Sequence, residues 1–425
     1  MIGALIAFAA FVALGVPIAF GIGAAAAIGL WVMDGVPLTI VASRTFGAID
    51  SFTFLAIPFF ILAGELMETG GISRRLIALA TALVGHVRGG LANVTVVAMM
   101  LFSGVSGSTN ADAATVGSVM IPSMRQKGWE AGRAGAVVAA AAGMGILVPP
   151  CLTMVVYGSV TNTSIAALFA AGLLPTLVMA GALLLHIRFQ GAGPPPERRM
   201  PMGERLRVLR GAALALGLPV IIFGGILGGA FTPTEAALVV AVAYAVLAGV
   251  LHRELTPAFF WGALVRSGVS TGAVMLMIAG ANILAWLLTV EQVPQTLAAF
   301  IAEVGGGRMG FLLLSLVVFL VLFALLDGIP GMLMLIPVFV PIAKELGIDP
   351  LHYGLVMTTV MGIALFLPPL GVGLYIVLGV SGASLPAISR ALAPYLLTMS
   401  AVAVVVALWP DLVLVLPRIM GLYAA

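Results

Sequence analysis

Apolar residues run along this chain in long blocks, and several blocks approach the length of a membrane-spanning helix. A helix rises about 1.5 Å per residue, so roughly 20 apolar residues cross the hydrocarbon core of a bilayer. The runs near this length are Ile2–Met33, Phe52–Met67, Gly211–Phe231, Ala236–Leu251, Gly268–Val290 and Ala391–Trp409. The two-residue alternation of a membrane barrel is absent from the sequence. We therefore expect an all-α polytopic membrane protein with about ten to twelve membrane segments.

Composition excludes a soluble protein. Hydrophobic residues make up 62% of the chain and charged residues 8%, and the mean hydropathy is +1.22. The net charge of +3 comes from cations in loops, where they report topology, so it does not indicate nucleic-acid binding. The single cysteine, Cys151, excludes an internal disulfide. The first apolar run has no basic start and no small-residue cleavage site, so we expect it to be a membrane span.

A stretch of the first half recurs in the second half without a gap. Pro149 and Pro368 are 219 positions apart (368 minus 149), and eight further pairs share this offset. These pairs are Pro122 and Pro341, Gly128 and Gly347, Gly135 and Gly354, Val137 and Val356, Gly143 and Gly362, Pro150 and Pro369, Leu173 and Leu392, and Pro175 and Pro394. An internal duplication within a membrane protein is typical of secondary transporters.

A polar segment from Arg188 to Arg210 separates the two copies. It holds three consecutive prolines and six arginines, and so many cations in a short loop indicate the cytoplasmic side. We expect a first repeat over residues 1–187, a cytoplasmic linker over residues 188–210 and a second repeat over residues 211–425.

Charge around the two copies predicts that they have opposite orientations. The loops that flank Leu91–Met124 sum to +3, from Arg88, Arg125, Lys127 and Arg133 against Glu130. The loops that flank Phe311–Leu346 sum to −1, from Arg308 and Lys344 against Glu303, Glu345 and Asp349. Because cations favour the cytoplasmic side, matching loops of opposite charge are expected on opposite sides, which predicts an inverted repeat.

Residues 91–124 and 311–346 each predict a re-entrant hairpin. In the first hairpin the arms Leu91–Phe102 and Ala111–Met124 have 12 and 14 residues, or about 18 and 21 Å of helix. Such arms are shorter than the roughly 30 Å membrane core, so we expect them to enter and leave on one side. Between them, Ser103–Asp112 is rich in hydroxyl, amide and carboxylate groups, which predicts an irregular polar tip.

The second hairpin is expected to turn at Asp327–Gly331. Each hairpin is followed by an apolar helix that contains a proline pair: residues 132–170 contain Pro149–Pro150, and residues 352–380 contain Pro368–Pro369. Proline removes a backbone donor and clashes with the preceding turn, so it leaves carbonyl oxygens without helical partners. Free carbonyls beside hydroxyls are suited to sodium, although a kink without any ligand is the structural alternative.

Six motifs spread along the chain point to one family. They are Asp50–Phe52 leading into Ala56–Met67, Ser106–Ser108 followed by Ala111–Ala113, Gly145–Pro150, Phe231–Ala237, Asp327–Pro330 and Leu367–Pro369. On these motifs, and over nearly its whole length, the sequence resembles the large membrane subunit of the tripartite ATP-independent periplasmic (TRAP) transporters.

The resemblance implies a secondary transporter that is driven by a sodium gradient, and not an enzyme. It implies symport of sodium ions with an organic acid anion, a carboxylate, which a periplasmic substrate-binding protein delivers at the bacterial inner membrane. It also implies an elevator mechanism, in which the hairpins and broken helices move as one block against a scaffold. Fused members of the family carry a further four-helix unit at the N-terminus, which this sequence lacks, so a separate small four-helix membrane subunit is implied.

Sodium ions are expected where each hairpin tip meets the carbonyl groups of a proline break. In the first half the candidate ligands are Ser103, Ser106, Asn110, Asp112, Gly145 and Pro149. In the second half they are Asp327, Gly328, Gly331, Met361, Gly362, Pro368 and Gly371. The candidates for contact with the substrate anion are Arg44, Ser103, Ser106, Ser108, Asn110 and Pro150. No catalytic residue is predicted, and the first tip is expected to hold more of the substrate.

Each candidate has a structural alternative. Serine and glycine ease the close packing of membrane helices, so hydroxyl groups at the first tip need not bind a ligand. Asp112 and Asp327 lie near expected helix starts, where a carboxylate caps free amides. Arg44 offers a bidentate guanidinium to an anion, but an arginine near the membrane interface also extends toward the headgroups. Ile72–Val84 and Pro294–Val304 are expected to be interfacial brace helices, or else short spans.

Three other classes of protein share parts of this pattern. A stand-alone sodium-coupled carboxylate or ion transporter would have similar hairpins without needing a binding protein. An intramembrane enzyme would need a two-histidine zinc pattern or paired aspartates on facing spans, and the sequence has neither. A purely structural subunit would not need the polar groups of Ser103–Asp112.

Overall fold

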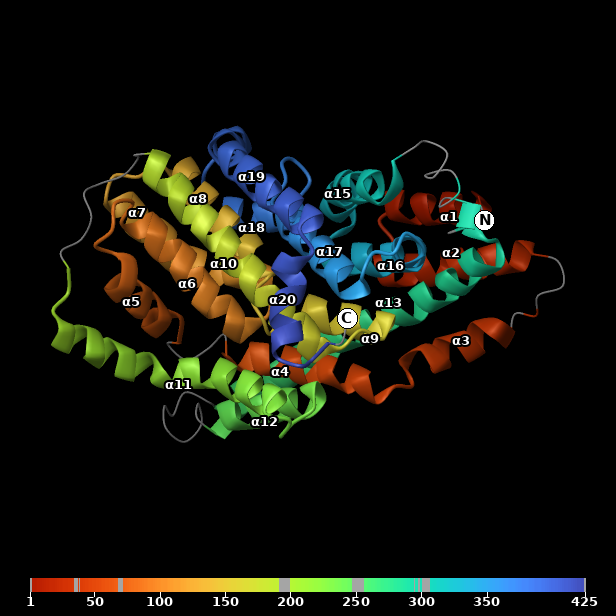
Figure 1. The fold of residues 1–425 in the computed structure, drawn as a ribbon, viewed down its shortest axis with the longest axis horizontal. Helices are drawn as coiled ribbons and strands as arrows, with labels where there is room; N and C mark the ends of the chain where they lie inside the picture. The colour runs from red at the N-terminus through yellow and green to blue at the C-terminus, as the bar shows by residue number, and fades with distance from the viewer. Residues whose placement is uncertain are drawn as a thin grey trace.

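The computed structural model describes residues 2–33, 39–67, 72–190, 199–246, 256–293 and 306–423, with a few single positions between these ranges. Every regular element in the described ranges is helical, which confirms the all-α prediction (Figure 1). The elements are α1 (Ile2–Ala13), α2 (Ile18–Val32), α3 (Thr39–Ile49), η1 (Phe52–Leu55), α4 (Ala56–Met67), α5 (Ile72–Val84), α6 (Leu91–Ser106), α7 (Thr109–Gln126), α8 (Ala131–Gly145), α9 (Leu152–Thr161), α10 (Ile165–Gln190), α11 (Met202–Leu227), α12 (Pro233–Val246), α13 (Pro257–Val290), α15 (Gly307–Leu326), α16 (Gly328–Glu345), α17 (Pro350–Ala364), α18 (Val372–Ser381), α19 (Leu385–Leu408) and α20 (Asp411–Ile419).

Fewer single helices have membrane length than the sequence predicts. Within the described ranges these are α10, α13, α15, α16 and α19, and a sixth span is counted if α3 and α4, bent by 62°, act as one. The expected number was about ten to twelve. Breaks account for part of the difference: the run Ile2–Met33 divides into α1 and α2 at Gly15–Pro17, where Gly15 has a φ of 76° and Pro17 precedes α2.

The first hairpin, formed by α6 and α7, has longer arms and a tighter turn than expected. Its arms have 16 and 18 residues, or about 24 and 27 Å. Helix α6 continues through Ser106 and α7 begins at Thr109, so Gly107 and Ser108 alone lie between them. Gly107 ends α6 with a φ of 67°, a conformation that glycine adopts without strain. The prediction of an irregular tip was wrong, because small polar residues stay helical when their side chains find partners.

The second hairpin, formed by α15 and α16, turns at Asp327, inside the expected segment. Asp327 has a φ of 64°, and its Oδ1 accepts a hydrogen bond of 2.8 Å from the backbone N–H of Gly328. The carboxylate therefore caps the start of α16, as the structural alternative for this residue proposed.

Both proline pairs lie in breaks between helices. Pro149–Pro150 separate α8 from α9, and Pro368–Pro369 separate α17 from α18. In both pairs the peptide bond between the prolines is cis. The helices that lead into the breaks form the centre of the molecule, and α17 is buried at every position from Leu351 to Ala364.

Helix boundaries recur with the offset of the duplicated sequence. Helices α7 and α16 begin and end 219 residues apart (328 minus 109, 345 minus 126), and so do α8 and α17 (350 minus 131, 364 minus 145). The last two touch at Gly143 and Gly362, which share the same offset. A Cβ atom at Gly143 would lie 2.6 Å from the carbonyl oxygen of Gly362, so the backbones meet because neither residue has a side chain.

The polar segment between the two halves is more helical than expected. Helix α10 extends to Gln190 and α11 begins at Met202, so much of the predicted linker 188–210 belongs to helices. Arginine and leucine favour helices, and a charged stretch read by hydropathy alone resembles a loop. Residues 191–198 lie outside the described part of the chain.

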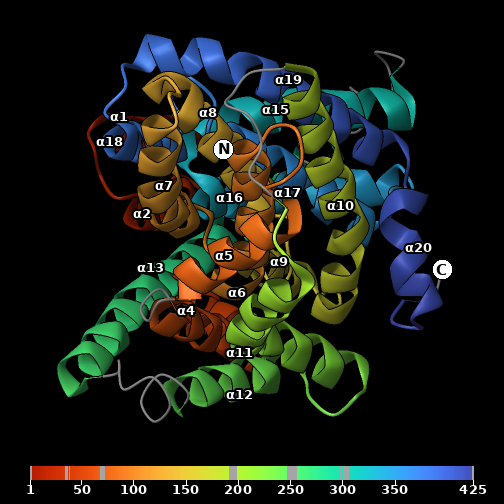
Figure 2. The same cartoon turned by 90° about the vertical axis from the view of Figure 1, so that its left-hand side faces the viewer.

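Helix α13 packs against both the N-terminal helices and the second hairpin. It contacts α2, α3, α4 and α16, and α4, α11 and α12 gather on one side of the molecule, opposite α8, α18 and α19 (Figure 2). The expected brace Ile72–Val84 coincides with α5, which packs on α6 and α11. The other expected brace, Pro294–Val304, lies largely outside the described residues.

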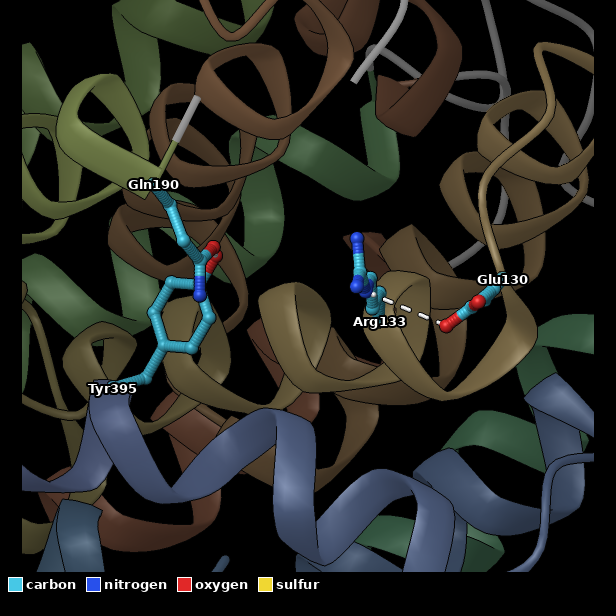
Figure 3. A network of polar contacts seen from close by, with 4 residues as sticks. All are labelled: Glu130, Arg133, Gln190 and Tyr395. Carbon is cyan, nitrogen blue, oxygen red and sulfur yellow. Dashed lines mark hydrogen bonds and ion pairs between the residues drawn. The ribbon is translucent and has the colours of Figure 1, made fainter. Parts of the chain in front are cut away.

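Polar contacts at the ends of α8, α10 and α19 are structural. Tyr395 on α19 donates a hydrogen bond of 2.8 Å to Oε1 of Gln190 on α10 (Figure 3). The centroid of its ring lies 4.5 Å from that of His186. Arg133 Nε lies 3.4 Å from Glu130 Oε2 at the start of α8, and both side chains are exposed (Figure 3). Such exposed pairs contribute little stability.

Candidate functional site

The first hairpin holds a buried carboxylate between its arms. Asp112, in the first turn of α7, is 0% exposed. Its two oxygens accept hydrogen bonds from the hydroxyl groups of Ser103 and Ser106, which lie on α6. Ser106 Oγ also lies 3.3 Å from the backbone N–H of Ser108. Since an intramembrane carboxylate is costly unless its oxygens have partners, these contacts hold the two arms of the hairpin together.

This tip lies directly against the first proline break. A Cβ atom at Gly145 would lie 3.1 Å from the Cβ of Ser103 and 3.6 Å from Oδ2 of Asp112. Cβ atoms at Gly104 and Gly107 would each lie 3.4 Å from a carbonyl oxygen, those of Pro149 and Pro150 respectively. The sequence candidates of the first half are therefore brought together, with hydroxyl, carboxylate and carbonyl oxygens in one small volume.

The second tip meets α17 but only part of the second break. A Cβ atom at Gly328 would lie 2.9 Å from Sδ of Met361, so these two candidates are neighbours. Gly331 packs instead on Phe323, with 2.9 Å from its Cβ position to the ring. Gly362 packs against the backbone of Gly143, which fills the space beside it.

The outer part of the second break lies away from the tip. Gly371 folds back on its own break, where its Cβ position would lie 2.8 Å from the backbone nitrogen of Leu367. Pro368 is half-buried and Pro369 is exposed, whereas Pro149 and Pro150 are both buried. The structure therefore groups Asp327, Gly328 and Met361, and it leaves Gly331, Pro368 and Gly371 outside that group.

A cavity of about 320 Å³, which we call the central cavity, lies between the two tips. It is lined by Gly107, Ser108, Thr109 and Asn110 of the first hairpin, by Asp327, Gly328, Ile329 and Pro330 of the second, and by Ile146, Leu152, Thr153, Ser270, Ala273, Val274, Met277, Met361 and Leu365. Oδ1 of Asn110 is buried and has no hydrogen-bond partner among the described residues. The cavity thus combines apolar walls with a few polar groups from both halves, as small-molecule sites do.

Two further cavities adjoin the hairpins. The α4 cavity, about 180 Å³, is lined by Phe60, Ile61, Ala63, Gly64, Glu65, Val105, Ser106, Gly107, Ser108, Pro150, Leu152, Ile222, Val240, Ser270 and Val274. The outer cavity, about 450 Å³, is lined by Gly47, Ala48, Ser51, Phe54, Ser159, Val160, Thr161, Asn162, Ile278, Ala281, Asn282, Ala285, Leu333, Ile336, Pro337, Val340, Pro341 and Lys344. Ser106, Ser108 and Pro150 therefore border the α4 cavity, on the side of the first tip that faces α4.

The three cavities follow one another along α13. Ser270 and Val274 line both the α4 and the central cavity, Met277 lines the central cavity, and Ile278 to Ala285 line the outer cavity. From 270 to 285 is 15 residues, or about 22 Å along the helix. The hairpins and α9 line parts of these cavities, together with α3, η1, α4, α11 and α12, so the cavities lie where the hairpins and α9 meet α13 and its neighbours.

Sequence reasoning missed the contribution of α13 and α9 to the site. Ser270 lines two cavities and Thr153 lines the central one. The hydroxyl groups of Ser267 and Thr271 are buried without partners among the described residues. The available signal was the cluster of hydroxyl residues 267, 270 and 271 within an otherwise apolar helix, at spacings that share one helical face.

Arg44 is not brought to the tips. It is exposed on α3, and its guanidinium lies 5.6 Å from the ring centroid of Trp286 on α13. It lines none of the three cavities described above. Glu65 of the motif on α4 forms an ion pair of 2.7 Å with Arg266 on α13, which is a contact between helices.

The described part of the chain is all-helical, has several membrane-length helices, and holds a cavity with a few polar groups between two helical hairpins, which fits a multi-pass membrane protein of the transporter class. Residues 5–412 match the family model described as "Tripartite ATP-independent periplasmic transporter, DctM component". The chain belongs to this family, so it is a transporter permease and not an enzyme. This confirms the resemblance on which the sequence motifs converged.

Curated relatives agree with the family assignment. The chain is 41% identical over 383 residues to the C4-dicarboxylate TRAP transporter large permease protein DctM of Pseudomonas aeruginosa, covering 90% of each chain. It is 36% identical over 421 residues to the sialic acid TRAP transporter large permease protein SiaM of Vibrio cholerae, covering 99% of each. Among solved structures, the fold is similar to that of the Alcanivorax borkumensis YdaH transporter, with a TM-score of 0.65, 16% identity, and coverage of 89% and 90%.

Proposed function

We propose that this chain is the large membrane subunit of a sodium-coupled symporter that imports an organic acid anion, a carboxylate. The observation that carries this proposal is the central cavity, which polar residues of both hairpin tips line together. The substrate class is supported by the relatives, which are named for transport of a C4-dicarboxylate and of sialic acid. The substrate contacts nearest the cavity are the hydroxyl of Ser108 and the amide of Asn110.

Sodium is proposed to bind where oxygen atoms converge. In the first half these atoms belong to Ser103, Ser106 and Asp112, with the carbonyl groups from Gly145 to Pro150 close by. In the second half, Asp327 and Gly328 lie beside Met361. Unwound backbone carbonyls at helix breaks are common sodium ligands in transporters. A cation there would reduce the cost of burying both Asp112 and an anionic substrate.

We further propose an inverted repeat that works as an elevator. The shared offset of α7 with α16 and of α8 with α17 supports the repeat, as does the meeting of Gly143 with Gly362. Contacts are also reciprocal: α8 packs on α19 and α17 on α10, while α7 packs on α18 and α16 on α9. In this proposal α6–α9 and α15–α18 move as a block along α13 and α4, where the cavities lie. The charge bias of the flanking loops supports the inversion.

The family description supports two partners and a location. The family is described as a tripartite periplasmic transporter. We therefore propose that the chain lies in the bacterial inner membrane and assembles there with a small four-helix membrane subunit. We propose that a periplasmic binding protein delivers its substrate. The alternative is a stand-alone sodium-coupled carboxylate transporter. Uptake that needs no added periplasmic protein would favour that alternative.

Substitutions at the first tip test the proposed site. Ser106→Ala and Asn110→Ala should abolish sodium-dependent uptake in proteoliposomes, because each removes a polar group from the tip. The matched control is Ser118→Ala, an exposed serine on the same hairpin whose hydroxyl bonds only the Thr115 carbonyl at 2.8 Å among the described residues. Size-exclusion profiles should be unchanged for all three. Wild-type uptake by the two tip variants would refute the site.

A further inference from the structure

A groove on the outer face of α10 combines apolar walls with two arginines. It has a volume of about 330 Å³. It shares no lining residue with the three cavities along α13. Its lining, which defines the α10 groove, is Val84, Val87, Arg88, Asn93, Gly181, Leu184, Leu185 and Arg188.

The turn between α5 and α6 brings the two arginines to one end of the groove. Gly89 has a φ of 111°, and a Cβ atom there would lie 2.7 Å from Cγ2 of Ile187 on α10. Arg88 precedes Gly89 and Arg188 follows Ile187, so the close packing of the Ile187 side chain on Gly89 brings the two arginines near each other. Asn93 donates a hydrogen bond of 2.9 Å from Nδ2 to the carbonyl oxygen of Arg88, which fixes the turn.

The polar end of the groove has unmatched charge and an unmatched acceptor. Both arginines are exposed, and neither forms an ion pair with any residue that the structure describes. Asn93 is 3% exposed, and its Oδ1 has no hydrogen-bond partner in the described part of the chain. A ligand at this end would therefore carry negative charge and a donor group.

The remainder of the groove is apolar and open to the membrane. Leu185 is 53% exposed and Val87 is 36% exposed, and no other charged group lines the groove. Exposed leucines on a membrane-length helix contact acyl chains, because the surrounding solvent there is hydrocarbon. An inorganic anion would leave this apolar wall without a partner.

We propose that the α10 groove binds an anionic glycerophospholipid. The phosphodiester lies between the guanidinium groups of Arg88 and Arg188, a headgroup hydroxyl donates to Oδ1 of Asn93, and one acyl chain covers Leu184 and Leu185. Basic pockets between membrane helices on the cytoplasmic side are suited to such headgroups, and the cation-rich loops of the first half place this end of the groove there.

The second half of the chain shows that the fold does not require Asn93 or Arg188. At the offset of 219 their counterparts are Leu312 and Ala407, whereas Arg88 has Arg308 one position beyond its counterpart, Gly307. Helices α15 and α19 form without them. A purely structural role in the duplicated architecture therefore does not account for Asn93 and Arg188.

Native mass spectrometry of the purified full chain tests the proposal, with titration of phosphatidylglycerol and of phosphatidylcholine that carry the same acyl chains. The double variant R88Q/R188Q should bind phosphatidylglycerol about thirtyfold more weakly than the wild type, since each cation near the headgroup contributes to affinity. The control R125Q/R207Q removes the same charge from exposed positions outside the groove and should bind like the wild type. Phosphatidylcholine should bind weakly to all three.

Three results would overturn the proposal. Unchanged phosphatidylglycerol binding by R88Q/R188Q would show that the groove is not the site. An equal loss in R125Q/R207Q would show that diffuse surface charge attracts the lipid. Displacement of the lipid by inorganic phosphate at equal concentration would show a site for a free anion. Matching thermal unfolding of both variants in lipid-free detergent checks that the fold is intact.

Discussion

At the scale of residues, the site depends on polar groups that hydrocarbon would otherwise penalise. Asp112 is fully buried and shares its oxygens with Ser103 and Ser106, while Asn110 leaves an acceptor open at the central cavity. Satisfied groups hold the hairpin together, and unsatisfied groups facing a cavity are available to a ligand. These bonds leave Ser103, Ser106 and Asp112 compatible with the proposed sodium site, because hydroxyl and carboxylate oxygens have further lone pairs for a cation.

Ser270 provides a prediction at this scale, because it lines both the central and the α4 cavity. Ser270→Leu should abolish substrate uptake in proteoliposomes, since the larger apolar side chain fills space at the boundary and removes a hydroxyl. Ser118→Leu, at an exposed position of α7, should transport like the wild type. If Ser270→Leu transports normally while remaining folded, the cavities along α13 are not on the substrate path.

The sequence predicted the polar cluster of the first tip, but it did not predict the contribution of Ser270 or the position of Arg44. The cluster from Ser103 to Asp112 stood out because carboxylates and amides are rare in apolar sequence. Ser270 did not, because serine and threonine in a membrane helix usually ease packing. Arg44 was considered for its charge, yet stacking on Trp286 gives the guanidinium a local partner that only the fold reveals.

At the scale of elements, the two halves meet through glycine. Gly143 on α8 and Gly362 on α17 let two central helices touch backbone to backbone. Small residues permit such contacts in membrane proteins, where dispersion between close helices stabilises the fold. A side chain added at Gly143 or Gly362 would push the backbone of the facing helix away. Backbone moves less easily than the end of a flexible side chain, so such a substitution is costly.

Gly143→Ala therefore should lower the free energy of unfolding in detergent by about 1–3 kcal/mol, because the added Cβ meets a carbonyl oxygen. The matched control is Gly224→Ala on α11, where nothing lies within 4 Å of the Cβ position. That change should be neutral or stabilise by up to about 1 kcal/mol, since alanine favours helices. Denaturant titration followed by tryptophan fluorescence measures both. Equal effects of the two substitutions would contradict the close contact.

The positions of turns and helix breaks were easier to predict from the sequence than the number of membrane-length helices. Glycine and proline act locally, so the turn at Asp327 and the breaks at both proline pairs lie where these residues indicate. Among the described residues, fewer single helices have membrane length than the number of segments expected, because several apolar stretches form shorter helices such as α2, α6, α9 and α18. Helix α17 has 15 residues and is buried throughout its length by other helices.

At the scale of the whole molecule, one long helix faces a duplicated set of hairpins and broken helices. Helix α13 lines the α4, central and outer cavities, and α7 and α8 of the facing elements recur as α16 and α17 at one sequence offset. The α4, central and outer cavities leave space along the boundary between α13 and the hairpins. Such space is compatible with movement of the hairpins relative to α13. In the proposed mechanism, import against a gradient requires that sodium and substrate together favour the crossing of the block.

Reconstituted uptake tests this central claim most directly. Proteoliposomes that contain the chain and its small membrane subunit receive labelled organic acid, with or without an inward sodium gradient and with or without the periplasmic binding protein. We predict accumulation only when both the sodium gradient and the binding protein are present, and its collapse when a sodium ionophore dissipates the gradient. Accumulation of equal extent without sodium, or without the binding protein, would contradict the proposed mechanism.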